Sequence, residues 1–191
     1  PGLVSVAFNA STSGSTATGL FLATASGVSL VKGGGGVGTV SMNNSNQIVF
    51  DGSSGIWLGT AAGAAPIIQS NEPAPGGGTI QNPVNPMIND RGDILFSAGI
   101  SPDNHAAIFL RTADGTIKKI AENGQTIDGG VLQNVVNSYA KPHLNNKGLV
   151  MFIADISKSG NQVPGIFLGD GTDLVKLIAV GDSLTGGTAA T

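Results

Sequence analysis

Carboxylates are the most abundant groups in this sequence that could form an active site, because it has no cysteine and only two histidines, His105 and His143. A facing pair of carboxyl groups is sufficient chemistry for glycoside hydrolysis. The 12 acidic residues fall mostly in turns, however, and the only Trp and Tyr residues that could form a sugar platform are Trp57 and Tyr139. A carbohydrate-active enzyme with paired carboxylates therefore stays an alternative, and we assign no catalytic residue.

Nucleophilic and metal chemistry find little support. The sequence lacks a G-x-S-x-G elbow for a serine hydrolase. The two histidines have no partner at short range, which argues against zinc, and we expect both to lie outside the regular strands. Residues Asp170 to Asp173 offer oxygen ligands for calcium but stand between two apolar runs, where Asp-Gly favours a hairpin turn. We predict no metal and no cofactor.

Two short motifs are better explained as turns. Residues 33–38 match the dinucleotide pattern G-x-G-x-x-G, but residues 39–44 are typical of a strand and a turn, not of the helix that would hold the phosphates. Arg91-Gly92-Asp93 spells an adhesion tripeptide. The following repeat has Lys147-Gly148 at the same place, so this glycine is expected to provide backbone freedom in a turn.

Composition and charge exclude some partners. The net charge is −3 and the pI is about 5.1, which argues against nucleic acid. No apolar run approaches the ~18 residues of a membrane span, so no membrane insertion is expected. The lack of cysteine, together with many Asn, Ser, Thr and Gly residues, fits an extracellular or cell-surface protein, although no export signal is present in this chain.

The strands that would position these residues recur along the chain. An Asn-rich turn followed by an apolar strand occurs three times, at residues 43–50, 89–96 and 145–152, and residues 4–8 offer a fourth strand of this kind. A second strand follows each one and keeps an aromatic residue at one position. This position is occupied by Phe21, Trp57, Phe109 and Phe167.

Each unit continues with a third strand, a loop that ends in paired glycines and a short fourth strand. The third strands are expected at residues 28–31, 66–68, 117–121 and 174–179, and the fourth at 79–80 and 131–136. Units of this length suit a propeller blade, for which ~40 to 50 residues are usual. The sequence therefore predicts an all-β, β-propeller-like array of four-stranded repeats with little helix.

The predicted domain covers residues 1–191, with repeats at approximately 1–42, 43–88, 89–144 and 145–191. The first repeat lacks its Asn turn and the fourth stops before its last strand. About three and a half blades are therefore expected, and the chain is interpreted as a fragment of a larger propeller or as one part of a ring.

The repeated pattern carries a resemblance. Asn-x-x-Gly-x-x-x-Phe, then Gly-Ile-Phe-Leu, then Ile-Ala-x-x-Gly-Asp with a later Gly-Gly resembles a tandem-repeat family of bacterial secreted and surface-anchored chains with no assigned function. The resemblance implies propeller-like β-repeats. It implies no catalytic residue, since its motifs describe turns and core aromatic residues.

One polar position recurs in the loops before the paired glycines, where Glu72, Gln125 and Asp182 align. Such residues usually cap backbone amides, and they could also face a shared ligand. They are the candidate ligand-facing positions.

The function that the sequence favours is a non-enzymatic secreted or cell-surface module with an interaction or structural role, which would bind a protein or a glycan. A fibre or homo-oligomer in which a second copy completes the propeller is a further alternative.

Overall fold

The chain is all-β. The computed structural model describes residues 5–11, 18–136, 140–185 and 187–190, and these contain strands, turns and loops but no helix, hence none that could cross a membrane. The strands are β1 (Val6–Ser11), β2 (Thr18–Thr24), β3 (Gly27–Gly33), β4 (Val40–Met42), β5 (Ile48–Gly52), β6 (Gly55–Thr60), β7 (Gly63–Gln69), β8 (Ile80–Ile88), β9 (Ile94–Ile100), β10 (His105–Arg111), β11 (Ile117–Glu122), β12 (Thr126–Ile127), β13 (Gly130–Gln133), β14 (His143–Leu144), β15 (Val150–Lys158), β16 (Asn161–Gly169), β17 (Leu174–Ala179), β18 (Ser183–Leu184) and β19 (Gly187–Thr188).

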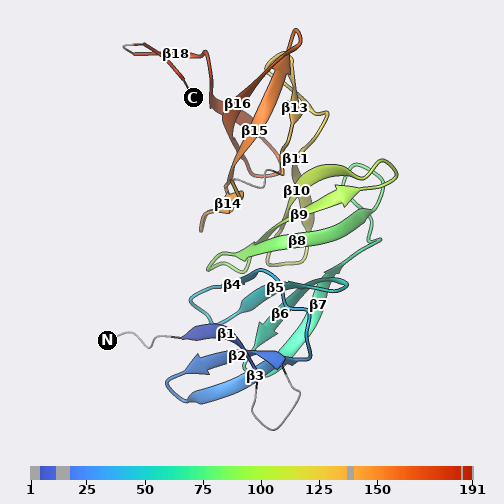
Figure 1. Ribbon diagram of the computed structural model, residues 1–191, viewed down its shortest axis with the longest axis vertical. Helices are drawn as coiled ribbons and strands as arrows, with labels where there is room; N and C mark the ends of the chain where they lie inside the picture. Colours follow the sequence, from blue (N-terminus) through green and yellow to red (C-terminus); the bar gives the residue numbers. More distant parts are fainter. Residues whose placement is uncertain (1–4, 12–17, 137–139, 186, 191) are drawn as a thin grey trace.

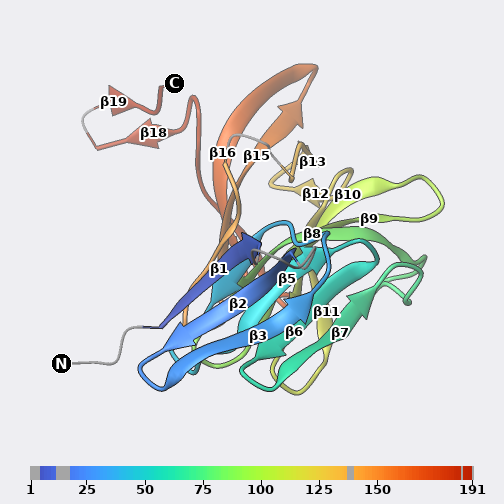
Figure 2. The same ribbon diagram turned by 60° about the horizontal axis from the view of Figure 1, so that its bottom comes forward.

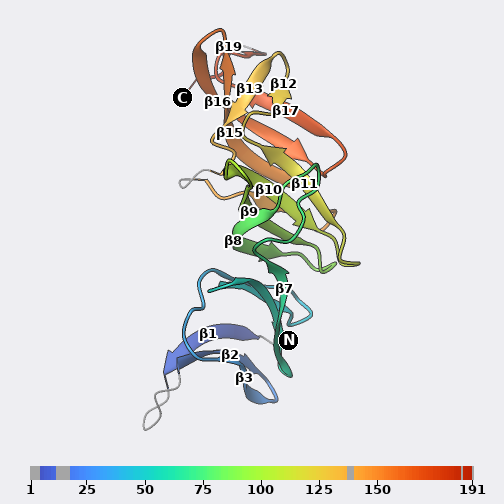
Figure 3. The same cartoon turned by 90° about the vertical axis from the view of Figure 1, so that its right-hand side faces the viewer.

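The strands form successive antiparallel sheets. β1–β2–β3 is three-stranded, whereas β4–β5–β6–β7 and β8–β9–β10–β11 each have four strands in sequence order. The last large sheet runs β12–β13–β15–β16–β17, with β14 also paired to β15, and it curls into a half-barrel. The four sheets follow one another along the long axis of the molecule from the N-terminal to the C-terminal end (Figures 1 and 3).

Each large sheet holds a stacked aromatic pair at the same cross-strand position. Phe8 faces Phe21, Phe50 faces Trp57, Phe96 faces Phe109 and Phe152 faces Phe167. Their ring centroids lie 5.8, 6.3, 5.1 and 5.5 Å apart. Offset stacking of this kind contributes about 0.5–1.5 kcal/mol beyond the burial of apolar area. The aromatic positions identified in the sequence are therefore partners within one sheet.

A bulge recurs next to each pair. In all four sheets the register of the last two strands shifts between the residue before the aromatic and the aromatic itself, as it does between Ile56 and Trp57 and between Ile108 and Phe109. The extra residue lies on the last strand of the sheet and is Val31, Ile67, Ile120 or Leu177. A bulge strengthens local twist, so the same shift gives all four sheets a similar twist at this point.

The core lies between consecutive sheets. One face of each of the first three sheets is aliphatic and packs against the aromatic face of the next sheet. Leu20, Leu22 and Val31 of the first sheet cluster with Phe50 and Trp57 of the second. Ile56 and Ile68 cluster with the Phe96 and Phe109 pair, and Ile108 and Ile120 with the Phe152 and Phe167 pair. The sheets are thus joined by one kind of contact, used three times.

The sheets are offset from the sequence segments 1–42, 43–88, 89–144 and 145–191, by one strand at the first two boundaries and by three strands, β12, β13 and β14, at the last. β4, β8 and β14 lie at the ends of the first three segments, yet each pairs with the strand that follows the Asn turn. The reason is local, because the Asn turn joins those two strands as a hairpin. The expected all-β class with little helix is confirmed, and the described sheets form an open stack without a closed ring.

The expectation that both histidines lie outside the strands is wrong. His105 is the first residue of β10 and faces Ile100, while His143 is the first residue of β14 and faces Met151. The hairpins extend past the apolar runs by which the strands were placed. At His105 this extension is compatible with a polar side chain, because the ring is hydrogen-bonded to Glu122.

Candidate functional site

The three Asn turns have one geometry. Asn43, Asn89 and Asn145 each accept two backbone N–H groups on their side-chain Oδ1, from the residues two and four positions later. The backbone of each Asn also bonds to the residue four positions later and accepts from the residue three positions later. One side chain thus organises the whole turn, as Asx turns do. The fourth residue of each turn needs a positive φ, which Asn46, Gly92 and Gly148 adopt at 59°, 86° and 82°.

The same side chains link consecutive turns. The amide nitrogen of Asn43 donates to the backbone oxygen of Asn89 at 3.0 Å, and that of Asn89 donates to the backbone oxygen of Asn145, also at 3.0 Å. We call this series the Asn ladder. Asn43 and Asn89 are buried, whereas Asn145, at the end of the ladder, is exposed. The burial follows from position, since a further turn covers the first two but not the third.

A second row of contacts runs beside the ladder. Asp90 accepts the backbone N–H and the side-chain amide of Asn44 at 2.9 Å each, and it also accepts the side-chain amide of Asn146. The bond from the Asn44 backbone, followed by that from Asn146, lowers the pKa of Asp90 below its ordinary value. The carboxylate is therefore used to join three turns.

The adhesion tripeptide does not display its carboxylate. Asp93 is buried, where it accepts the side-chain amide of Asn89 and the backbone N–H of Ala113. Arg91 is exposed and lies 3.4 Å from Asp93, and it also donates to the backbone oxygen of Lys147. The structure thus supports the interpretation of residues 91–93 as part of a turn.

Glu72, Gln125 and Asp182 are not brought together in one site. Each accepts the backbone N–H of the residue three positions earlier, at 2.8, 3.3 and 2.8 Å. Each also starts a hairpin that is closed by a pair of backbone bonds, to Ile80, Leu132 and Ala189 respectively. Their aligned positions thus correspond to one structural role in three loops. This is the capping role that was the alternative to a ligand-facing one.

A polar pocket lies between the loop that connects β7 to β8 and the third sheet, β8–β9–β10–β11. Glu122 accepts Lys119 at 2.6 Å and contacts the ring nitrogen of His105 at 2.9 Å. Together with the glycines 76–78 these residues line a hollow of about 480 Å³. Burial raises the pKa of Glu122, but the bonds from Lys119 and His105 outweigh it and hold the pKa below its ordinary value. Glu122 is therefore an ionised, paired carboxylate and is poorly suited to donate a proton.

Lys176 occupies in the last sheet the register position of Lys119. It contacts Asp128 at 2.9 Å and Asp182 at 3.0 Å, and Lys158 lies 3.6 Å from the same Asp128. The hydrogen bond from Lys176 lowers the pKa of both aspartates, and the bond to Asp128 followed by that to Asp182 raises the pKa of Lys176. Asp128 lies in the turn between β12 and β13 of the same sheet, so the cluster fastens that turn to β17.

Metal chemistry gains no support from the described part of the chain, where no group of three or more His, Asp or Glu side chains is arranged to hold an ion. Asp170 accepts the backbone N–H groups of Thr172 and Asp173 in the turn between β16 and β17. These two bonds lower its pKa, that from Asp173 first. The predicted hairpin turn is confirmed there. Tyr139, one of the two residues considered for a sugar platform, lies outside the described residues.

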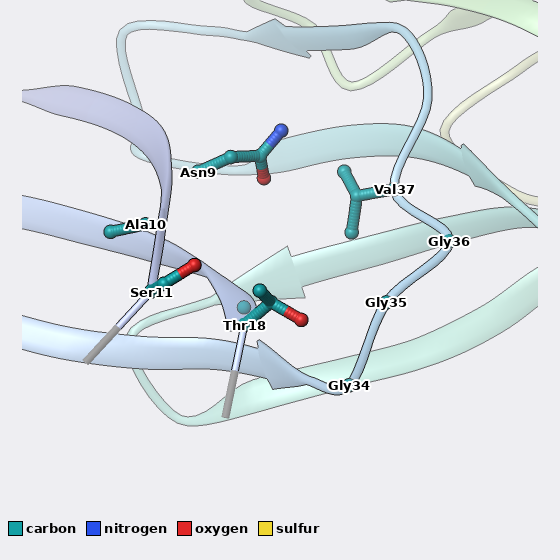
Figure 4. A pocket seen from close by; sticks show the side chains of 9 residues that line it. Asn9, Ala10, Ser11, Thr18, Gly34, Gly35, Gly36 and Val37 are labelled. Carbon is teal, nitrogen blue, oxygen red and sulfur yellow. The ribbon is translucent and has the colours of Figure 1, made fainter. Parts of the chain in front are cut away.

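The glycine-rich segment after β3 opens no helix. It connects β3 to β4 directly, with Gly34 and Gly36 at positive φ, so the context that a dinucleotide site needs is missing. A hollow of about 410 Å³ lies between this connection and the end of β1. Figure 4 shows Asn9 and Thr18 on one side of it and Val37 on the other. The hollow is lined mainly by backbone and short side chains.

Exposed apolar side chains gather on the two outer faces of the stack. On the aromatic face of the first sheet these are Val6, Phe8, Val28 and Leu30, and on the aliphatic face of the last sheet they are Met151, Val175 and Leu177. Among the described residues the other large exposed apolar side chains are Val84 and Leu184. Concentrations of this kind mark contact surfaces. We call the two surfaces the aromatic end face and the aliphatic end face.

Comparison with known proteins places the chain in a family. The model of DUF7453, a family of unknown function, matches residues 6–191. The chain belongs to this family. The DUF7453 match covers all four large sheets, so they are parts of one family unit. Neither a curated protein nor a solved structure matches the chain.

Three features of this DUF7453 chain were not predicted from the sequence. The Asn ladder had a signal, because Asn43, Asn89 and Asn145 all precede the apolar strands, but the spacing alone does not show that the turns touch. The equivalence of Lys119 and Lys176 could have been found from their place in the third strand of each unit. The end faces had no sequence signal, since their residues are of the same types as those buried between the sheets.

Proposed function

We propose that the protein is a non-enzymatic extracellular or cell-surface module, built of propeller-type tandem repeats, that makes structural contacts with other proteins through its end faces. The observation that carries this proposal is the contrast between its polar and apolar groups. Most carboxylates described above are engaged in turns or lysine pairs, whereas two apolar faces lack a covering sheet in the described residues.

The repeat interpretation is supported by what the sheets share. The aromatic pair, the bulge and the inter-sheet contact recur in the same register, and an Asn turn joins two paired strands in each of the last three sheets. Sheets of four antiparallel strands stacked face to face through an apolar layer are the units of a propeller. Residues 1–191 are on this proposal one repeat domain, and the four sheets are its blades.

A protein is a better partner for this surface than a glycan. Sugar sites use exposed aromatic platforms and polar side chains, but Trp57 stacks on Phe50 and packs in the core between the first two sheets. The exposed apolar residues are mostly aliphatic and lie on sheet faces, which suits the packing of another sheet. No nucleic acid and no membrane insertion enter the proposal.

The carbohydrate-active alternative makes a separate prediction at the polar pocket. We would incubate the purified chain with a panel of polysaccharides and measure reducing ends released, beside Glu122→Gln and, as a control, Glu72→Gln. The proposal predicts no release by any of the three. Hydrolysis by the wild type that Glu122→Gln abolishes and Glu72→Gln retains would replace the module with an enzyme.

The location is tested separately. Antibodies against the chain are expected to label intact cells of the source organism without permeabilisation, and added protease should remove the label. Labelling that requires permeabilised cells would refute the extracellular part of the proposal.

A further inference from the structure

The outer faces of the stack are the two halves of its internal contact. Between sheets, an aliphatic face carrying a bulge residue packs against a stacked aromatic pair. Phe50, Phe96 and Phe152 are 0, 0 and 2% exposed there, whereas Phe8, at the same position in the first sheet, is 38% exposed. The bulge residue Leu177 of the last sheet is 54% exposed.

The exposure follows the position in the stack. Ile120 and Val31 hold the place of Leu177 in their sheets, and each is 3% exposed because the next sheet covers it. Met151 is exposed for the same reason, although Val49 and Leu95 at its register position are buried. The aliphatic end face thus needs an aromatic pair, and the aromatic end face needs an aliphatic one.

From this complementarity we propose that a second copy of the chain packs head to tail, its aromatic end face against the aliphatic end face of the first. This inference rests on the proposed contact function and names the partner. The contact is heterologous, so one such contact leaves an end face free on each copy. A second contact of the same kind between these two free faces closes two copies into a ring. Two copies contain twice the four main sheets of one chain. A ring of eight sheets is within the usual range of about four to eight propeller blades, so a closed dimer is the expected product.

Two other features are incomplete at the ends of the stack. The Asn ladder donates in one direction along the chain, and its last member, Asn145, is exposed. The first sheet has three strands, and β1 has β2 as its partner on one edge only within the described residues. A neighbouring copy therefore meets an incomplete sheet at one end and an unfinished ladder at the other.

The C-terminal hairpin can complete that sheet. β18–β19 is closed by the same backbone bonds as β12–β13, those of Gly181 and Ala189 matching those of Gly124 and Leu132. β13 then pairs with β15 of the next sheet. Among the described residues β19 pairs with β18 alone, and the hairpin projects from the stack (Figures 1 and 2).

The pairing register follows from these equivalences. Gln133 of β13 faces Asp155 of β15. Ser11 occupies in β1 the position of Asp155 in β15, each three residues after the stacked Phe of its strand. Ala190 occupies the position of Gln133, since each follows the residue that closes its hairpin. The register of β8 on β9 gives the same result, so Ala190 of one copy is expected opposite Ser11 of the other.

Light scattering over roughly a hundredfold range of concentration gives the mass, since association is driven by mass action. The wild type is expected to reach a dimer. Phe8→Asp and Leu177→Asp, one on each end face, should each be monomeric with the far-UV circular dichroism of the wild type. Val84→Asp places the same charge on an exposed apolar residue away from both faces and should leave the dimer intact.

Mixing the two monomeric variants separates head-to-tail packing from symmetric packing. Phe8→Asp keeps an intact aliphatic end face and Leu177→Asp an intact aromatic one. An equimolar mixture should therefore form a heterodimer with a single contact, which cannot close or grow. A mixture that stays monomeric while the wild type is dimeric would overturn the head-to-tail arrangement.

A disulfide tests the register, and the absence of native cysteine gives a clean background. Ser11→Cys and Ala190→Cys, oxidised together, should form a mixed disulfide between copies, because directly opposed strand residues lie at a suitable distance. Oxidation of either variant alone should yield no comparable dimer. A wild type that stays monomeric throughout, without the mixed disulfide, would refute the second copy as partner. The proposed non-enzymatic function would survive that result, because it fails only in the hydrolysis assay or in the surface labelling.

Discussion

Replacing Asn89 by alanine tests whether the Asn ladder stabilises the stack. The side chain accepts the backbone N–H groups of Arg91 and Asp93 and donates to Asp93 and to the backbone oxygen of Asn145. It is 5% exposed, so water cannot replace these partners fully. A net contribution of about 1 kcal/mol per bond predicts a loss of roughly 3 to 4 kcal/mol in the free energy of unfolding.

Asn145→Ala is the matched control. This side chain accepts two backbone N–H groups in the same kind of turn, but it is exposed and the structure records no bond from it to a further turn. Because water can solvate the freed amides, the expected loss is only about 1 kcal/mol. The difference between the two variants isolates burial and the link to the next sheet from turn formation itself.

Equilibrium unfolding in urea measures both losses. Far-UV circular dichroism follows all the sheets, while the single tryptophan, Trp57, reports on the second sheet. For a chain of this size, a loss of roughly 3 to 4 kcal/mol in the free energy of unfolding lowers the melting temperature of Asn89→Ala by roughly 10 °C. The reasoning would be refuted if Asn89→Ala lost no more stability than Asn145→Ala. Asn89→Asp should be at least as damaging as alanine, because its second oxygen would face the carboxylate of Asp93.

Three further outcomes are expected. Gly55→Ala should destabilise far more than Gly63→Ala, as measured by urea unfolding, because both have positive φ but only at Gly55 would a methyl group overlap a carbonyl oxygen of β7; equal losses would contradict this. Phe96→Ala should cost about 3–5 kcal/mol in the same assay, since it empties a fully buried position, and a loss below 1 kcal/mol would be inconsistent with the core described. The carboxyl carbon of Asp128 should titrate by NMR with a midpoint below the ordinary 3.8, because a hydrogen bond from Lys176 lowers its pKa. This pairing therefore stabilises the fold at a pH above the ordinary pKa, and the stabilisation is lost as the pH falls through the lowered value. Lys176→Met should move the midpoint upward, whereas an unchanged midpoint would exclude the contact.

The sequence was sufficient for the first three strands of each unit and their order, because these depend on local patterns. The short strands β12, β14, β18 and β19 were not predicted, and β8 runs to Ile88 where only residues 79–80 were expected. The aromatic position of the second strand and the apolar residues after the three Asn turns place seven strands, and residues 4–8 place an eighth. The third strand is marked by Asp-Gly turns such as that at Asp170. Pairing of neighbouring strands then follows from short connections. The observed strands extend the predicted ones at most ends, because a hairpin continues through polar residues such as His105 once their side chains have partners.

The contacts between sheets were beyond sequence reasoning. Asn43 and Asn89 are 46 residues apart, and nothing local shows that one donates to the backbone of the other. The alignment of Glu72, Gln125 and Asp182 left two roles open, backbone capping and contact with a ligand. The hydrogen bonds to backbone amides show the capping contact, which the sequence alone could not, and the ligand-facing role stays a prediction. Exposure of Phe8 and Leu177 is likewise a property of the stack, since their types equal those of their buried counterparts.

The row of Asn turns has a consequence for mechanical load. The sheets follow one another along the long axis, so a force that pulls on the two ends of the chain is carried by every sheet-to-sheet contact. The weakest of these contacts opens first. Asn43 and Asn89 each bridge one such contact at a turn, whereas no bond of this kind from the first sheet is described. Under tension, the three-stranded first sheet is therefore expected to detach before the others, so that the chain lengthens in steps while the remaining sheets stay folded. At the proposed cell-surface location, the protein would in this way yield to force one sheet at a time.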